Sequence, residues 1–382
     1  MKLNSVQALR ALAAGGVVIG HLRSIEGKHS SESPLLSELL VNGASGVDLF
    51  FVISGFIMVW VAGDNVQGAR SAGRFLFSRA TRIYPLWWLF AGAMAIYFWA
   101  TYGLPWDAVN LDKYQIDGTT HLLKSFALMP QEVFPLLGVG WTLVHEMYFY
   151  LGFALLLFLS PGWRITGLAI WGGAVIVGSV IGLSDKFAGT WLELAFFPMT
   201  FEFIMGAFVA ITIKAGWSKY GWLTATLGAI SFVVVFVLFD FKTGGILFSR
   251  FTFTDANAFM LGWGRTLFFG IPAAFLLHGL VSLELTKGWG KYIPRPLVWV
   301  GDWSYALYLC HVLVLSAVAR LYFPIFSAPG QTDSIVFMGI GGLASILVAG
   351  LTYHFYEGPL LAWFRPLRNR LFKGTPSTEN TV

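Results

Sequence analysis

Long apolar segments separated by short polar connections run through the whole chain. About ten of these segments have the roughly 20 residues that a helix needs to cross a bilayer. The pattern therefore predicts an all-α integral membrane protein. We expect the spans near residues 5–22, 47–62, 85–102, 138–159, 165–183, 190–213, 220–239, 258–282, 300–323 and 334–355.

Successive connections differ in charge: every second one is net positive, whereas those between them are acidic or neutral. The connection over residues 63–84 carries four arginines against one aspartate, whereas the connection over 103–137 carries two lysines against four acidic residues. Because connections rich in Lys and Arg stay on the cytoplasmic side, this alternation predicts ten spans with both termini cytoplasmic. We find no internal repeat, which argues against a transporter built from inverted repeats.

Composition agrees with the membrane class. Only 12% of the 382 residues are charged, compared with about 25% in soluble domains. The net charge of +5 would fit a nucleic-acid partner, but the positive excess lies in the cytoplasmic connections, so we expect no nucleic acid. The single cysteine, Cys310, excludes an intrachain disulfide and a cysteine-rich metal site, and no metal is expected. We expect one membrane domain over 1–373 and a polar tail over 374–382.

The first apolar segment contains two polar side chains that can bear charge, Arg10 and His21. They lie eleven positions apart, which is about three helical turns, so they share one face about 16 Å apart along the axis. A charge inside a spanning helix costs at least about 2.5 kcal/mol and usually faces protein or a wet cavity. Alternatively, Arg10 snorkels to the headgroups and His21 ends the helix at the opposite interface. Their shared face favours a catalytic function.

Arginines are clustered just before the third predicted span. Arg79 and Arg82 are three residues apart and share a helical face, and Arg74 lies one to two turns earlier. Pro85 is expected to restart the chain into the span. Guanidinium groups bind phosphates through forked hydrogen bonds, although the same cluster could simply anchor the protein to anionic lipid. The absence of lysine favours a phosphate ligand.

Two carboxylates are candidate partners of His21. Glu146 lies in the outer half of the fourth span, at the depth expected for His21, and the two could form an acid/base pair. A purely structural hydrogen bond between helices is the alternative. Asp48, near the outer end of the second span, is either an orienting group for His21 or Arg10 or a helix-start residue. Further polar residues inside the spans are candidate lining groups: Glu202, Arg265 and His311. His145 is expected to be structural.

Several segments together resemble the acyltransferase-3 family of integral membrane enzymes. They are Arg10 with ten residues before His21, followed by GVDLFFVISGF, RIYP, WTLVHEMYFY, FEFIMGAF, GDWSYALYLCH and YEGP. Within that family the sequence is most similar to bacterial exopolysaccharide O-acetyltransferases of the ExoZ type.

The resemblance implies a ten-helix enzyme of the bacterial inner membrane. Such enzymes move an acyl group, here expected to be acetyl, from cytoplasmic acyl-CoA to a hydroxyl of an envelope polysaccharide or lipid-linked sugar. The resemblance makes His21 the catalytic histidine, Arg10 its motif partner and Glu146 the acid of the WTL segment. It makes Arg79 and Arg82 the pair that binds the donor.

Two other functions remain open at this stage. In a secondary transporter or flippase, His21 and Glu146 would relay protons while the arginines hold a lipid phosphate. In a non-catalytic scaffold of a polysaccharide export complex, each of these side chains would be dispensable. The split between arginines on the inner side and acid/base groups on the outer side favours the enzyme. The sequence leaves open the acceptor, the acyl group and whether His21 acts as a base or as a covalent carrier.

Overall fold

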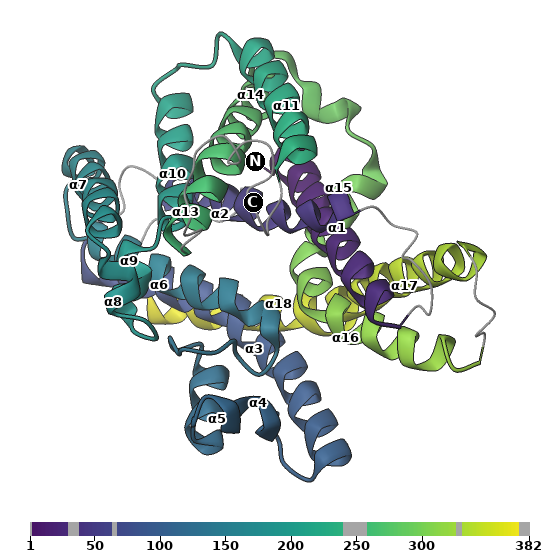
Figure 1. Cartoon of the computed structure of the whole chain (residues 1–382). Helices are drawn as coiled ribbons and strands as arrows, with labels where there is room; N and C mark the ends of the chain where they lie inside the picture. Colours follow the sequence, from purple (N-terminus) through teal and green to yellow (C-terminus); the bar gives the residue numbers. More distant parts are fainter. Residues whose placement is uncertain (1, 30–37, 63–66, 240–257, 326–330, 374–382) are drawn as a thin grey trace. The chain divides into compact units, whose positions relative to one another are not determined.

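Every regular element in the described part of the chain is a helix, as Figure 1 shows. This computed structural model describes residues 2–29, 38–62, 67–239, 258–325 and 331–373. Within them, eight helical stretches are long and apolar enough to cross a membrane, which confirms the predicted all-α membrane class. Two predicted spans contain the shorter helices α6 (Trp141–Leu156) and α10 (Thr200–Lys214). The count of ten spans and the cytoplasmic termini stay predictions, and the predicted tail lies outside the described residues.

The chain forms two compact units, each assembled from segments far apart in the sequence. The first unit is built mainly from Met1–Val61 and Phe201–Leu351, and the second from Ala62–Thr200 and Thr352–Ser377. The elements of the first unit are α1 (Asn4–His29), η1 (Glu38–Ser45), α2 (Gly46–Ala62), α10, α11 (Gly221–Leu238), α13 (Ala258–Arg265), η3 (Thr266–Gly270), α14 (Ile271–Lys287), η4 (Trp289–Tyr292), α15 (Arg295–Asp302), α16 (Ser304–Tyr322) and α17 (Gln331–Thr352).

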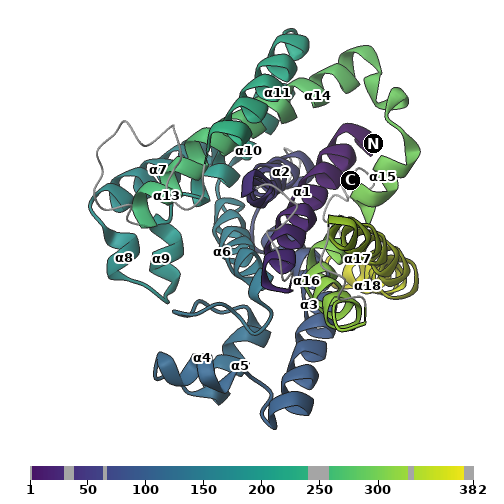
Figure 2. The same cartoon turned by 45° about the vertical axis from the view of Figure 1, so that its right-hand side comes forward.

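Helix α1 is the central element of the first unit. It contacts η1, α14, α15 and α16, and it shares one apolar core with α2, α10 and α14. Figure 2 shows α1 beside α2, and Figure 1 shows α11 lying along α14. The core side chains include Leu9, Val52, Ala210 and Leu277, all fully buried. The helix that carries Arg10 and His21 is thus the one around which the first unit packs.

Glycines allow α2 and α10 to touch through their backbones. A Cβ atom on Gly55 would collide with the carbonyl oxygen of Phe203, and one on Gly206 would collide with that of Val52. Small residues at such positions are typical of tightly packed membrane helices. The first turns of these two helices carry Asp48 and Glu202, which lie near each other.

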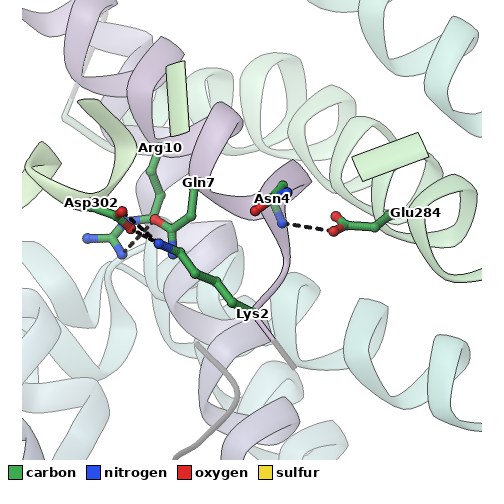
Figure 3. A network of polar contacts seen from close by, with 6 residues as sticks. All are labelled: Lys2, Asn4, Gln7, Arg10, Glu284 and Asp302. Atoms are coloured by element: carbon green, nitrogen blue, oxygen red, sulfur yellow. Dashed lines mark hydrogen bonds and ion pairs between the residues drawn. The ribbon is translucent and has the colours of Figure 1, made fainter. Parts of the chain in front are cut away.

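The N-terminus of α1 is held by a carboxylate from another helix (Figure 3). Glu284 of α14 accepts hydrogen bonds from the backbone N–H groups of Asn4 (2.9 Å) and Ser5 (2.7 Å). The first N–H groups of a helix lack partners within it, and a negative charge there also complements the helix dipole. Lys2 adds an ion pair to Asp302 at 2.6 Å. These contacts fix the position of α1 along its axis.

We expect Glu284→Ala to destabilise the protein by about 1–2 kcal/mol, the usual cost of losing a helix cap. The variant leaves two buried N–H groups of α1 without acceptors, whereas Glu284→Gln keeps one acceptor oxygen and should lose less. Thermal unfolding in detergent measures the effect. Lys2→Ala is the control, because exposed ion pairs contribute little. An unchanged melting temperature in Glu284→Ala would contradict this role.

The second unit is organised around one long helix. Its elements are α3 (Ala69–Tyr102), α4 (Ala108–Lys113), α5 (Gly118–Ala127), η2 (Gly138–Gly140), α6, α7 (Pro161–Val180), α8 (Leu183–Lys186), α9 (Trp191–Phe196), η5 (Tyr353–Glu357) and α18 (Gly358–Leu371). Helix α3 contacts α5, α6, α18 and η5.

The expectation that Pro85 restarts the chain is wrong. Helix α3 is continuous over 34 residues with Pro85 inside it, so the arginine cluster lies on the same helix as the predicted span. Proline removes one backbone hydrogen bond, but neighbouring groups can satisfy the freed carbonyls in membrane helices. The carbonyl that loses its helical partner is that of Thr81, four residues before Pro85. The Tyr356 hydroxyl donates to the carbonyl of Pro85 itself at 3.2 Å, which ties η5 to α3 at this turn.

Candidate functional site

His21 lies against a second histidine that the sequence analysis did not include in the site. Nε2 of His311, from α16, is 3.3 Å from Nδ1 of His21, and the two rings meet edge to face with centroids 4.8 Å apart. Each Nδ1 atom also faces a backbone carbonyl one turn earlier, Val17 for His21 and Leu307 for His311, both at 3.0 Å. The only sequence signal for this pair was the placement of His311 inside a span.

These contacts fix the tautomers of both neutral rings. A carbonyl oxygen only accepts hydrogen bonds, so Nδ1 of each ring must carry the hydrogen. Nε2 of His311 is then a lone pair that accepts from Nδ1–H of His21. Nε2 of His21 is in turn left with a lone pair, and no hydrogen bond to it is formed within the described residues. His21 is therefore oriented as a proton acceptor, the arrangement required of a general base.

We expect His311→Ala to lower kcat by roughly 2- to 12-fold with little change in the donor KM. The substitution removes one neutral hydrogen bond from His21, worth about 0.5–1.5 kcal/mol, while the Val17 carbonyl keeps the tautomer. Separate kcat and KM values for the acyl transfer that the family resemblance implies measure this positioning role. Cys310→Ala is a matched control, because Cys310 is equally buried beside His311 and bonds only to the carbonyls of Leu307 and Ser345. An effect on KM alone would contradict the role.

Arg10 lies on the same uninterrupted helix as His21, as the spacing predicts. Its side chain is buried, and Nη1 donates to the amide oxygen of Gln7 at 3.4 Å (Figure 3). The backbone of Gln7 packs directly against Gly301 of α15, because a Cβ atom added to Gly301 would collide with the Gln7 carbonyl. The guanidinium is therefore enclosed by protein, which favours a functional position over snorkelling.

Asp48 is paired with a different residue from those expected. Both of its oxygens are held by Arg265 of α13, at 2.7 Å from Nη2 and 3.2 Å from Nε. Arg265 also donates to the carbonyl of Ala44 at 3.3 Å. An orienting role of Asp48 toward His21 or Arg10 stays a prediction. Arg265, predicted as a lining residue, is instead the partner that neutralises Asp48.

Two of the three predicted donor-binding arginines are available for a ligand. No described residue forms a hydrogen bond or ion pair with Arg79 or Arg82, and Nε of Arg79 is buried without a partner. Arg74 differs, because it donates to the side chain of Asn369 at 3.2 Å. Helix α18 also supplies Arg368, which donates to the Ser78 hydroxyl at 3.1 Å. The second unit thus places two unused guanidiniums one turn apart, beside a further basic helix.

Tyr150 contacts both Glu146 and Arg79, one of these two arginines. The Tyr150 hydroxyl donates to Glu146 at 2.5 Å, and the Tyr150 ring lies 5.9 Å from the guanidinium of Arg79. The ring of Phe75 lies against the same guanidinium at 5.7 Å. Aromatic faces attract cations, so the Tyr150 ring, which is bonded to Glu146, helps to hold Arg79. The sequence analysis had not linked Glu146 to Arg79.

The predicted residues thus fall into two groups. Arg10, His21 and Asp48 belong to the first unit, and the arginines and Glu146 belong to the second. The pairing of Glu146 with His21 stays a prediction. His145 donates from Nδ1 to the carbonyl of Trp141 and packs against the Phe197 ring, which agrees with its expected structural role.

Comparisons with known proteins give consistent matches. The family model described as the acyltransferase domain matches residues 3–354. The exopolysaccharide production protein ExoZ of Rhizobium meliloti (strain 1021) is 32% identical over 330 residues, which cover 84% of this chain and 90% of that protein. Nodulation protein 10 of Rhizobium leguminosarum bv. viciae is 25% identical over 304 residues, 74% of each chain. These matches confirm the resemblance indicated by the motifs.

One further relative is longer. A Staphylococcus aureus (strain COL) protein named as a candidate O-acetyltransferase is 25% identical over 380 residues. The match covers 93% of this chain but 56% of that protein, so the chain spans about half of that relative's length. No solved structure gives a significant match.

Proposed function

Because the chain belongs to the acyltransferase-3 family of membrane enzymes, we propose that it is an O-acetyltransferase of exopolysaccharide. The donor is cytoplasmic acetyl-CoA, and the acceptor is a hydroxyl of the polysaccharide or of its lipid-linked precursor. The location is the bacterial plasma membrane. The observation that carries the proposal is the partly buried His21, whose Nδ1–H is held by Val17 and His311 and whose Nε2 is left as a proton acceptor.

The donor is recognised through its phosphates. Coenzyme A carries a 3′-phosphate and a pyrophosphate, and guanidinium forks bind such groups through paired, charge-assisted hydrogen bonds. Arg79 and Arg82 supply these donors, since no described residue forms a hydrogen bond or an ion pair with them. The phosphates and the thioester lie at opposite ends of the long pantetheine arm. The residues that bind phosphate therefore need not adjoin those that perform the chemistry.

The transfer step uses His21 first as a base and then as an acid. Nε2 takes the proton of the acceptor hydroxyl while the hydroxyl oxygen forms a bond to the thioester carbonyl carbon. The carbon–sulfur bond then breaks, and His21 returns the proton to the departing sulfur of coenzyme A. Arg10 stabilises the negative charge that develops on the carbonyl oxygen.

Purified protein in lipid vesicles tests the function. We expect release of coenzyme A from acetyl-CoA only when a glycan acceptor is present, together with an acetylated acceptor in the mass spectrum. Surface glycans from cells with and without the protein provide the same readout in vivo. Movement of the acceptor across the vesicle membrane without acetyl transfer would instead support a transporter, and would overturn the proposal.

A further inference from the structure

A buried carboxyl group in the first unit has no hydrogen-bonding partner that would stabilise a negative charge. Glu202, in the first turn of α10, is completely buried. Neither of its oxygens has a hydrogen-bond partner within the described residues. An ionised carboxylate in that situation costs several kcal/mol or more. The proposed acyl transfer uses neither Glu202 nor its neighbours, so this group calls for a separate explanation.

The polar groups near Glu202 come from three other elements. Asp48 of α2, Arg265 of α13 and the Thr266 side chain of η3 lie beside it, and Tyr308 of α16 lies near Arg265. The cluster therefore contains two carboxyl groups and one guanidinium. Both oxygens of Asp48 are already bonded to that guanidinium, so Glu202 adds a negative charge that no cation in the cluster balances.

The backbone is shaped to accommodate the Glu202 side chain. Segment η3 is a π-helix, and its last residue is Gly270. A Cβ atom at Gly270 would lie 3.0 Å from Cγ and 3.4 Å from Oε1 of Glu202. The hydroxyl of Thr266, at the start of this segment, is also buried without a partner. Short π-helical segments frequently occur at functional sites.

We propose that Asp48, Glu202 and Arg265 form a buried proton-binding site, in which the two carboxyl groups together hold one proton. The proton makes the cluster electrically neutral, because two carboxyl groups with one proton balance one guanidinium. Two close carboxylates cannot both ionise cheaply. The site joins α2, α10 and α13, so it links the packing of the first unit to pH. This inference is independent of the proposed acetyl transfer.

Infrared spectroscopy detects the proton directly. The wild-type protein in detergent should show the C=O stretching band of a protonated carboxylic acid at neutral pH. Glutamate labelled with carbon-13 in its side-chain carboxyl should shift that band, and Glu202→Gln should remove it. Glu284→Gln is the matched control, since Glu284 is also buried in the first unit but accepts two backbone hydrogen bonds. It should leave the band unchanged.

Thermal stability provides a second readout. Unfolding releases the bound proton at neutral pH, so the melting temperature of the wild type should fall as pH rises, by proton linkage. Glu202→Gln should lose this part of the pH dependence and melt no lower than the wild type at alkaline pH. A carboxylic acid band that is absent from the wild type, or that persists in Glu202→Gln, would overturn the proposal. So would a melting temperature that follows sodium concentration at fixed pH, because a metal ion would then occupy the site.

Discussion

His21→Ala should abolish acetyl transfer while the protein still inserts and folds in the membrane. The substitution removes Nε2 of His21, the one ring nitrogen of the His21–His311 pair that its contacts leave as a proton acceptor. General base catalysis by histidine contributes about 10²- to 10⁴-fold, so the rate should fall by at least that range. Acceptor-dependent release of coenzyme A measures the loss, and the melting temperature confirms folding.

His29→Ala is the matched control for this prediction. His29 lies on the same helix and its Nδ1 also faces a carbonyl one turn earlier, that of Ile25 at 3.1 Å, but it stacks on Phe323 instead of a second histidine. It should retain activity within a few-fold of wild type. Near-normal acetylation by His21→Ala would show that another group performs the proton transfer.

Labelling of the wild-type protein tests whether His21 acts as a base or as a covalent carrier of the acetyl group. If His21 only moves a proton, incubation with labelled acetyl-CoA in the absence of acceptor should leave the protein unlabelled. Label on His21 under those conditions would replace the base mechanism with a two-step transfer through the imidazole.

Arg79→Gln and Arg82→Gln should each raise the KM for acetyl-CoA by about 10- to 150-fold with a smaller change in kcat. The range corresponds to a loss of about 1.5–3 kcal/mol for hydrogen bonds to a charged group. The lysine variants keep the charge but lose the fork, so they should recover only part of the affinity. Initial rates over a range of donor concentration measure the effect.

A modified donor identifies the phosphate that the arginines bind. If either arginine contacts the 3′-phosphate, its variant should lose nothing further when acetyl-dephospho-CoA replaces acetyl-CoA. Arg70→Gln is the control on the same helix, since Arg70 is exposed and donates to the carbonyl of Lys373. Unchanged KM values with reduced membrane insertion would instead make Arg79 and Arg82 an orientation signal.

Sequence spacing was sufficient to predict which residues are neighbours within a single helix. Spacing alone predicted that Arg10 and His21 lie on one helix and that Arg79 and Arg82 share a face. The apolar segments likewise predicted the membrane class. These relations hold within a single helix, where 3.6 residues per turn fix which side chains are neighbours.

Contacts between different helices became known only from the tertiary structure. It brought His311 to His21 across 290 residues, Arg265 to Asp48 across 217, and Glu284 to the start of α1 across 280. Nothing in the local spacing specifies such pairs, because they depend on which faces pack and on where glycines let backbones approach. Pro85 shows the same limit, because the local sequence predicts a break there, whereas α3 runs through it.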